Sequence, residues 1–187
     1  MEIYVIRHTQ VDVKSGTCYG QSEVALKSSF KEEAQRIKSE LNVDFDIVFV
    51  SPFSRCTLLA EELGYSKYNK DKRLCELNFG QWELKEWANI NVSEIDKWSK
   101  DIVNLRLPDG ENLNDLYNRV SDFMNELIKK DYEKVLIITH AGVIRCLWAY
   151  LLEFPLKNLF RIPVDFGEIF SFSISKNKEM INIIRKS

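Results

Sequence analysis

The chain has 187 residues, of which 45% are hydrophobic and 29% are charged, and its formal net charge is −2. That length suits one domain over residues 1–187, and the near-neutral charge argues against nucleic acid or an anionic membrane as the main partner. No apolar run approaches the roughly 20 residues that span a bilayer, and the chain passes from Met1 into a strand pattern with no basic, cleavable leader. We therefore expect a cytoplasmic protein without membrane or nucleic-acid partners. The sequence leaves open whether it is a monomer or a homodimer.

Cysteine and histidine are sparse. The four cysteines form no CxxC pair, and the two histidines stand far apart. Because zinc sites draw on grouped cysteines and histidines, we do not expect a metal site. We interpret Cys56, Cys75 and Cys146 as reduced, buried, apolar side chains, and Cys18 as a loop residue.

Hydrophobic periodicity predicts alternating strands and helices. In chain order we expect a strand at 2–7, a helix at 28–41, a strand at 46–50, helices at 51–64 and 111–130, a strand at 134–139, a helix at 142–153 and strands at 168–174 and 180–185. The first three strands are short and continuously apolar, which is typical of a parallel sheet buried on both faces. Residues 175–178 predict an antiparallel hairpin turn. We therefore expect a three-layer α/β/α fold with a mainly parallel sheet and an antiparallel C-terminal edge.

Two of the predicted helices carry capping signals at their starts. Ser29 and Glu32 have the spacing of a capping box for the helix over 28–41. Ser51 is predicted to cap the helix over 51–64, with a proline directly after it and a glycine as its stop.

The stretch from about residue 76 to 110 interrupts this alternation. It carries Trp82, Trp87 and Trp98, mixed charges and the turn LPDG. We interpret it as a helical cap inserted into the same domain. At least two of the tryptophans are expected to pack the insertion onto the core, and stacking on an aromatic base of a ligand is the alternative.

Basic and imidazole side chains follow three of the predicted strands. RHT (7–9) ends the first, SPFSR (51–55) follows the second, and THAG (139–142) follows the third. Ligands of open α/β sheets bind beyond the carboxyl ends of the strands. If these strands are neighbours, four side chains converge there: Arg7, His8, Arg55 and His140. Because arginine pairs bidentately with phosphate oxygens and stays charged, this set favours a phosphate.

The same set suggests nucleophilic catalysis. Neighbouring arginines stabilise the neutral form of an imidazole, which can attack phosphorus and form a phosphohistidine. The leaving alkoxide needs a proton, and Glu76 in RLCELNFGQWE, just past a short strand-like piece, is the candidate donor. Glu83 and Glu111 are rival acids, which we interpret as caps or braces of the insertion.

Each of these residues also has a structural interpretation. A histidine at the end of a buried strand commonly serves only as a hydrogen-bonded core residue, and Arg55 could pair on its own helix. We favour catalysis because both histidines stand beside turns with arginines at two of the strand ends, and because a cation in a first helical turn is disfavoured unless an anion binds nearby. Arg145, about one helical turn beyond His140, is predicted to point away from the pocket as an ion-pair residue.

Five segments in order resemble the histidine phosphatase superfamily, also called phosphoglycerate mutase-like: IRHT, SPFSRC, LCELNFGQWE, LPDGENLNDLYNRV and ITHAGVIRCL. The resemblance covers most of the chain, and the ordered set is far more specific than a lone RHT. It implies a phosphatase that needs neither a metal nor an organic cofactor. It implies His8 as the phosphate-accepting nucleophile, Glu76 as the proton donor, and a phosphate pocket of Arg7, Arg55 and His140.

RHT followed by VDVKSGTCYGQSEVAL resembles one branch of the superfamily, the alpha-ribazole phosphatases of cobalamin biosynthesis. This resemblance implies hydrolysis of alpha-ribazole 5'-phosphate to alpha-ribazole and phosphate. It implies a substrate-binding set made of Thr9, Cys18, Tyr19, Gly20 and Gln21. A broad-specificity or sugar-phosphate phosphatase and a non-catalytic phosphate-binding scaffold are the alternatives, and the short chain disfavours a phosphoglycerate mutase.

Overall fold

The computed structural model describes residues 1–174 and 181–186, in which six strands form one sheet of order β3-β2-β4-β1-β5-β6. The strands are β1 (Glu2–Arg7), β2 (Ile47–Val50), β3 (Asn69–Lys70), β4 (Lys134–Thr139), β5 (Ile169–Ile174) and β6 (Ile181–Lys186). The α-helices are α1 (Phe30–Glu40), α2 (Ser54–Glu62), α3 (Val92–Lys100), α4 (Leu113–Leu127) and α5 (Ala141–Leu152). Four short 3-10 helices complete the set: η1 (Lys72–Leu74), η2 (Gly80–Trp82), η3 (Trp87–Asn89) and η4 (Leu156–Arg161). All predicted strands and helices are present, β3 is additional, and α3 lies in the predicted insertion.

The sheet is parallel at its centre and antiparallel at one edge. β2 and β1 flank β4 in parallel, and β3 pairs in parallel with β2. β5 pairs antiparallel with β1, and β6 with β5, which confirms the predicted C-terminal edge. The predicted turn over 175–178 lies outside the described residues. The three strands that precede the predicted site residues are therefore adjacent.

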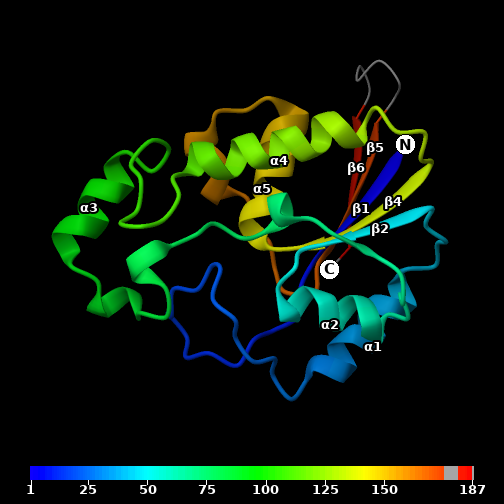
Figure 1. Cartoon of the computed structure of the whole chain (residues 1–187), viewed down its shortest axis with the longest axis horizontal. Coiled ribbons are helices and arrows are strands. Elements are labelled where there is room, and N and C mark those ends of the chain that lie inside the picture. The colour runs from blue at the N-terminus through cyan, green and yellow to red at the C-terminus, as the bar shows by residue number, and fades with distance from the viewer. Residues whose placement is uncertain (175–180, 187) are drawn as a thin grey trace.

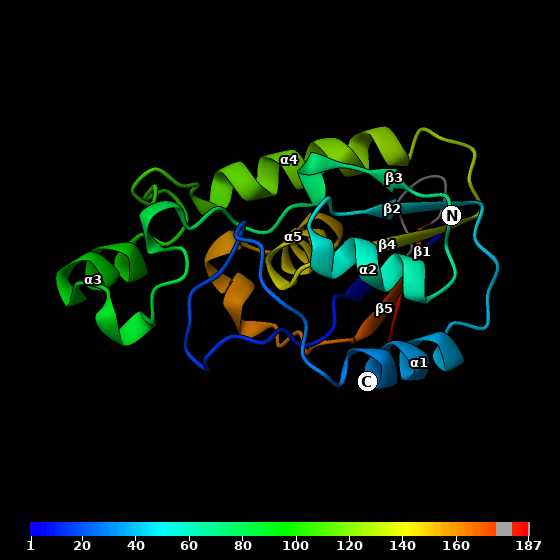
Figure 2. The ribbon, with the colours of Figure 1, turned by 60° about the horizontal axis from the view of Figure 1, so that its bottom comes forward.

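Helices cover both faces of this sheet, as Figure 1 and Figure 2 show. α4 and α5 pack on one face over a core that includes Val5 and Ile137, and α1 and α2 pack on the other over Ile6 and Ile138. Successive residues of a strand point to opposite faces, so the continuously apolar strands supply both cores. This confirms the three-layer α/β/α prediction. Along the residues that the structure describes, no helix is long and apolar enough to cross a membrane.

The starts of two helices differ from the predictions. The capping box of Ser29 and Glu32 is wrong, because the Ser29 hydroxyl donates to Glu33 Oε1 at 2.6 Å and no side chain caps the backbone of α1. α2 begins at Ser54, three residues later than the predicted start, and Ser51 does not cap it. Ser51 is instead buried, and its hydroxyl contacts one of the site histidines.

Residues 76–110 extend beyond the end of the sheet and place α3 far from it (Figure 1). Trp82, Trp87 and Trp98 contact one another there, with ring centroids 5.8 to 5.9 Å apart. Trp82 is buried, and its indole N–H donates to Glu94 Oε2 at 3.1 Å. Trp82 belongs to the core under α4 and α5, and Trp87 and Trp98 pack against that core, which confirms that at least two of the tryptophans pack the insertion onto the core.

Candidate active site

The sheet register brings the two histidines together. Arg7 of β1 pairs with Thr139 of β4, so His8 and His140 are the next residues on adjacent strands. Their ring centroids are 5.2 Å apart, and both side chains are buried. They line a cavity of about 180 Å³ whose wall also includes Arg7, Arg55 and Glu76.

His8 has its unprotonated nitrogen at Nε2. Its Nδ1 lies 2.8 Å from the carbonyl oxygen of Thr9. Because a carbonyl oxygen only accepts hydrogen bonds, Nδ1 carries the proton and Nε2 the lone pair. Burial lowers the pKa of His8 well below its usual value, and the charges of Arg55 and Arg7 lower it further. The ring is therefore neutral at physiological pH, as a nucleophile requires.

His140 has the opposite tautomer. The Nε–H of Arg55 donates to His140 Nδ1 at 3.3 Å, so the ring proton is on Nε2, 2.7 Å from Ser51 Oγ. Burial, and then the charge of Arg55, lower the pKa of His140 well below its usual value. Ser51 thus fixes the orientation of His140. Sequence reasoning missed this role, although Ser51 directly follows β2, the strand beside β4.

Arg7 and Arg55 bring positive charge to the cavity, and neither forms an ion pair with a carboxylate in the described part of the chain. Arg55 is fully buried and donates to the carbonyl oxygens of Gly20 and, at 2.8 Å, of Ser22. Arg7 donates to the carbonyl of Val164 at 2.6 Å, and its Nε is buried without a hydrogen-bond partner. Their remaining N–H groups suit the oxygens of a phosphate. Within the described residues, no group of three or more His, Cys, Asp or Glu is arranged to hold a metal ion.

Glu76 reaches the cavity from the loop after η1, so the piece just before it is a 3-10 helix and not the short strand that the sequence suggested. Thr139 Oγ1 donates to the carbonyl of Leu74 at 2.7 Å and so ties η1 to β4. The Glu76 carboxylate accepts the N–H groups of Leu77 at 2.9 Å and of Gly142 at 3.1 Å. Gly142 permits this approach, because a Cβ there would lie 2.1 Å from Glu76 Oε1.

The residues predicted to bind substrate divide into two groups. Cys18 and Tyr19 line the cavity. Thr9, Gly20 and Gln21 are not among the lining residues: Thr9 is fully buried, and the other two make backbone contacts that shape the loop.

Glu83 anchors the loop that carries Tyr19. Its carboxylate accepts the backbone N–H groups of Gly20 at 2.8 Å, Gln21 at 2.9 Å and Ser22 at 3.2 Å, and the Ser22 hydroxyl at 2.7 Å. Burial opposes ionisation, but these hydrogen bonds outweigh it and lower the pKa of Glu83. Since Arg55 donates to carbonyls of the same loop, Glu83 braces the loop from one side and Arg55 from the other.

The remainder of the cavity wall is mainly aromatic and apolar, and includes Phe79, Trp87, Leu113, Leu116, Leu159 and Phe160. Arg145 also lines it, which corrects the prediction that its helix turns it away. Its Nε donates to the carbonyl of Ile162 at 2.8 Å, and its terminal nitrogens have no hydrogen-bond partner within the described residues. Arg145 follows Gly142 by three positions and shares its helix face, a spacing signal that was present in the sequence.

The sequence matches the family described as the histidine phosphatase superfamily (branch 1) over residues 3–185, and the chain belongs to this superfamily. The adenosylcobalamin/alpha-ribazole phosphatase of Escherichia coli is 27% identical over 177 residues, which cover 89% of this chain and 87% of that protein. Phosphoserine phosphatase 1 of Hydrogenobacter thermophilus is 24% identical over 195 residues, which cover 100% of this chain and 91% of that protein.

A solved structure of the alpha-ribazole phosphatase from Shigella flexneri superposes with a TM-score of 0.89 at 25% identity, and the match covers 99% of this chain and 95% of that chain. The predicted phosphoglycerate mutase-like fold is confirmed by this likeness. The two relatives named above are phosphatases, which confirms the class of enzyme, but their names differ in substrate.

Proposed function

We propose that this protein is a phosphomonoesterase that works through a phosphohistidine on His8, with no metal ion or organic cofactor. One observation carries the proposal: the ring whose unprotonated nitrogen is Nε2 shares a cavity with Arg7 and Arg55, which have no carboxylate partner within the described residues. Two such charges attract a phosphate ester and offset charge that develops on the phosphoryl oxygens. Membership of a phosphatase superfamily supports the same reading.

In the first step, the lone pair on His8 Nε2 attacks phosphorus, and the bond from phosphorus to the ester oxygen breaks. The Nδ1 proton stays on the ring, where the Thr9 carbonyl stabilises the positive charge that develops. Glu76 donates a proton to the leaving oxygen, so the first product departs as a neutral alcohol. Arg7 and Arg55 hold the phosphoryl oxygens throughout.

In the second step, water attacks phosphorus of the phosphohistidine, and the bond to Nε2 breaks. The Glu76 carboxylate, now unprotonated, accepts the proton of that water. Inorganic phosphate leaves, and both His8 and Glu76 return to their starting protonation states. His140, held by Ser51, contributes a fixed polar wall beside the phosphoryl group.

For the substrate we propose alpha-ribazole 5'-phosphate. The relative from Escherichia coli and the structure from Shigella flexneri support this choice. The aromatic part of the cavity, with Tyr19 and Trp87 in its wall, suits a benzimidazole-bearing leaving group, because flat rings gain from stacked or edge-on contacts. The reaction would then belong to cobalamin biosynthesis.

A second candidate substrate class consists of small phosphomonoesters with an anionic or hydroxyl-rich leaving group, such as phosphoserine or a sugar phosphate. Arg145 favours it, because a guanidinium with free terminal nitrogens suits a carboxylate. The Hydrogenobacter thermophilus relative, which is named a phosphoserine phosphatase, supports this second class as well.

Steady-state comparison of alpha-ribazole 5'-phosphate, phosphoserine and a sugar phosphate tests the assignment. We expect kcat/KM to be highest for alpha-ribazole 5'-phosphate by at least about tenfold, the scale of about 1.4 kcal/mol of binding discrimination. A higher kcat/KM for phosphoserine would make phosphoserine the assigned substrate in place of alpha-ribazole 5'-phosphate. Equal kcat/KM values would indicate broad specificity. No turnover of any of them would favour a non-catalytic phosphate-binding protein.

We further propose that residues 76–110 serve as a cap within a single domain over 1–187. Phe79 and Trp87 from this segment line the cavity beside Glu76, so the insertion contributes both wall and the proposed acid to a site whose nucleophile and phosphate-binding groups lie at the strand ends. Exchange of residues 77–110 for those of a relative, with Glu76 retained, should change substrate preference and leave phosphohistidine formation intact.

A further inference from the structure

We propose that Arg119, together with Glu111, is a positioning residue that holds the backbone around Glu76 so that its carboxyl can transfer a proton. The inference rests on the proposed function of Glu76 as the acid. Neither Arg119 nor Glu111 is among the residues that line the cavity.

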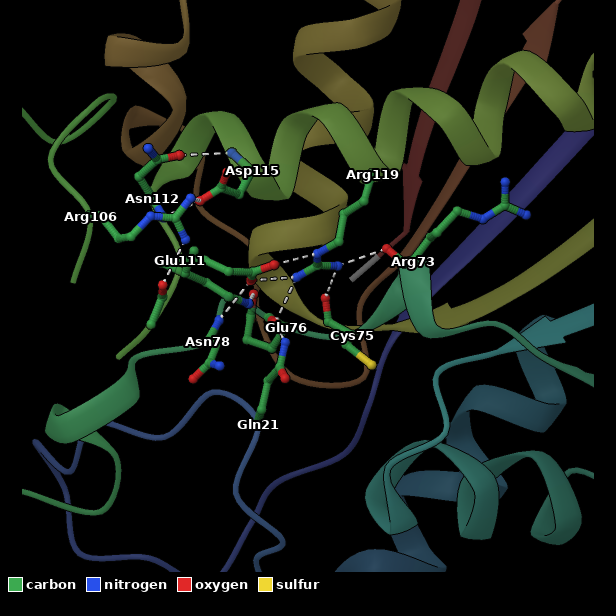
Figure 3. Close-up of polar contacts among 12 residues, drawn as sticks. Gln21, Arg73, Cys75, Glu76, Asn78, Arg106, Glu111, Asn112, Asp115 and Arg119 are labelled. Atoms are coloured by element: carbon green, nitrogen blue, oxygen red, sulfur yellow. Dashed lines mark hydrogen bonds and ion pairs between the residues drawn. The ribbon is translucent and has the colours of Figure 1, made fainter. Parts of the chain in front are cut away.

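Arg119 projects from α4 toward the segment that carries Glu76, as Figure 3 shows. Its Nη1 donates to the carbonyl of Arg73 at 2.7 Å and to that of Cys75 at 2.6 Å. Its Nη2 donates to the carbonyl of Glu76 at 2.8 Å. Nε and Nη2 also pair with Glu111 at 2.9 and 3.0 Å. All five N–H groups of the guanidinium are therefore engaged, which only the rigid fork of arginine achieves.

Glu111 completes the arrangement on the other side of Glu76. Its Oε2 accepts the backbone N–H of Asn78 at 2.9 Å as well as Nη2 of Arg119. The side chains of Arg119 and Glu111 are only 17% and 19% exposed, so the pair is shielded from competing water. The pair thus holds peptide groups on both sides of Glu76.

The position of the Glu76 carboxyl depends on this backbone. The carboxylate itself accepts only two hydrogen bonds within the described residues, both from backbone N–H groups, those of Leu77 and Gly142. The Leu77 N–H moves with the segment that Arg119 holds. The Glu76 carbonyl also accepts a hydrogen bond from Gln21 Nε2 at 2.9 Å, so the loop that Arg55 contacts is also bonded to this peptide (Figure 3). A shift of the backbone would therefore move the acid relative to the leaving oxygen, and proton transfer is sensitive to such a shift.

Replacement of Arg119 would destabilise the protein whether its role is to position Glu76 or is purely structural. A measurement of stability therefore does not distinguish these two roles. Leaving-group dependence does. An alkyl phosphate needs a proton on its leaving oxygen, whereas nitrophenolate leaves as an anion without one. We expect Arg119→Met to lower kcat/KM for an alkyl phosphate about 30-fold and for 4-nitrophenyl phosphate less than about threefold, a part of the 10²–10⁴-fold that general acid catalysis contributes.

Arg119→Lys should recover only a small part of the loss, because an ammonium lacks the fork. Arg106→Met is the matched control. Arg106 pairs with Asp115 at 2.7 Å and donates to the carbonyl of Gly110 at 2.9 Å, but it does not contact the segment of Glu76. We expect that control to change neither substrate by more than about twofold, as for a surface ion pair.

The double variant Arg119→Met with Glu76→Gln tests whether Arg119 acts through Glu76. If Arg119 acts through Glu76, Arg119→Met adds little to the loss that Glu76→Gln already causes on the alkyl substrate. Equal losses on both substrates, or full additivity with Glu76→Gln, would overturn the inference. If Arg119→Met does not fold, Glu111→Gln gives the same comparison at smaller amplitude. Absence of leaving-group dependence in Glu76→Gln alone would instead refute the proposed acid, which keeps the two failures distinct.

Discussion

The two halves of the cavity are built in different ways. The phosphate half consists of side chains that lie at the ends of adjacent central strands or in the first helical turn after them: Arg7, His8, Arg55 and His140. His8, Arg55 and His140 are only 2%, 0% and 0% exposed. The leaving-group half is formed by Tyr19, by the insertion, by α5 and by η4, whose Phe160 is 45% exposed. Sheet register therefore places the nucleophile and the phosphate-binding groups, and we propose that segments outside the sheet set the selectivity. On this proposal, substrate preference could change while the phosphate half stays intact.

The most severe test of this division is His8→Ala. Loss of the nucleophile should lower kcat at least about 10³-fold on every phosphomonoester, because no other group can form the covalent intermediate. Incubation with a labelled phosphomonoester should yield an acid-labile, base-stable phosphoprotein in the wild type only. A labelled adduct in the variant would assign the nucleophile elsewhere.

Gly142→Ala tests the boundary between the halves, where Glu76 meets α5. The added methyl would lie 2.1 Å from Glu76 Oε1 and would push the carboxyl aside, while the side chain is flexible enough for the fold to persist. We expect kcat/KM for alkyl phosphates to fall about 10²-fold, with a much smaller loss on 4-nitrophenyl phosphate. Thermal unfolding of the variant serves as the control. Equal loss on both substrates would show that the acid is not what the methyl displaces.

Arg145→Met addresses the leaving-group half alone. Removal of this cation should change the ratio of kcat/KM for phosphoserine to that for alpha-ribazole 5'-phosphate by about tenfold, against phosphoserine. Methionine is the matched replacement because it keeps much of the side-chain length without the charge. Activity on 4-nitrophenyl phosphate should hardly change. If the ratio stays constant, Arg145 is a structural residue, as the sequence interpretation had it.

The smallest effect concerns stability and pH, and it should be confined to the phosphate half. The pKa values of His8 and His140 lie well below the usual value near 6.5, so between the folded and unfolded pKa values the unfolded chain binds more protons. The free energy of unfolding is then highest above about pH 6.5. It falls as the pH falls below that value, by at most about 1.4 kcal/mol per pH unit for each histidine. Denaturant unfolding between neutral and acidic pH measures the slope. His140→Asn should flatten it, and an unchanged slope would contradict the assignment.

The strand ends were predictable because parallel strands meet at one edge, so Arg7, His8, Arg55 and His140 needed only adjacent strands to converge. Arg145 was misplaced although it stands three residues after Gly142. The start of α2 was missed because its first N–H is accepted by the carboxylate of Glu23, from a loop far away in sequence. Capping by a distant side chain leaves no local pattern.

The contacts that position Glu76 were also not predictable, because they too join residues that are distant in sequence. Glu111 was expected to brace the insertion, and it does contact Asn78, but its pairing with Arg119 depends on how α4 packs against η1. Local periodicity predicts that a helix forms and which face is apolar, but not which polar group on its flank meets a loop. The fold and the phosphate half therefore follow from sequence far better than the leaving-group half.

The pairing of β1 with β4 also has a consequence for biogenesis. The two imidazoles become neighbours only when the first strand meets a partner synthesised much later, and such non-local contacts form slowly. A nascent chain that ends before β4 lacks His140 and the strand beside which His8 is placed, so we expect it to be inactive while it emerges from the ribosome. During refolding, we therefore expect enzyme activity to return only when β1 pairs with β4, which should be later than the return of the helical signal.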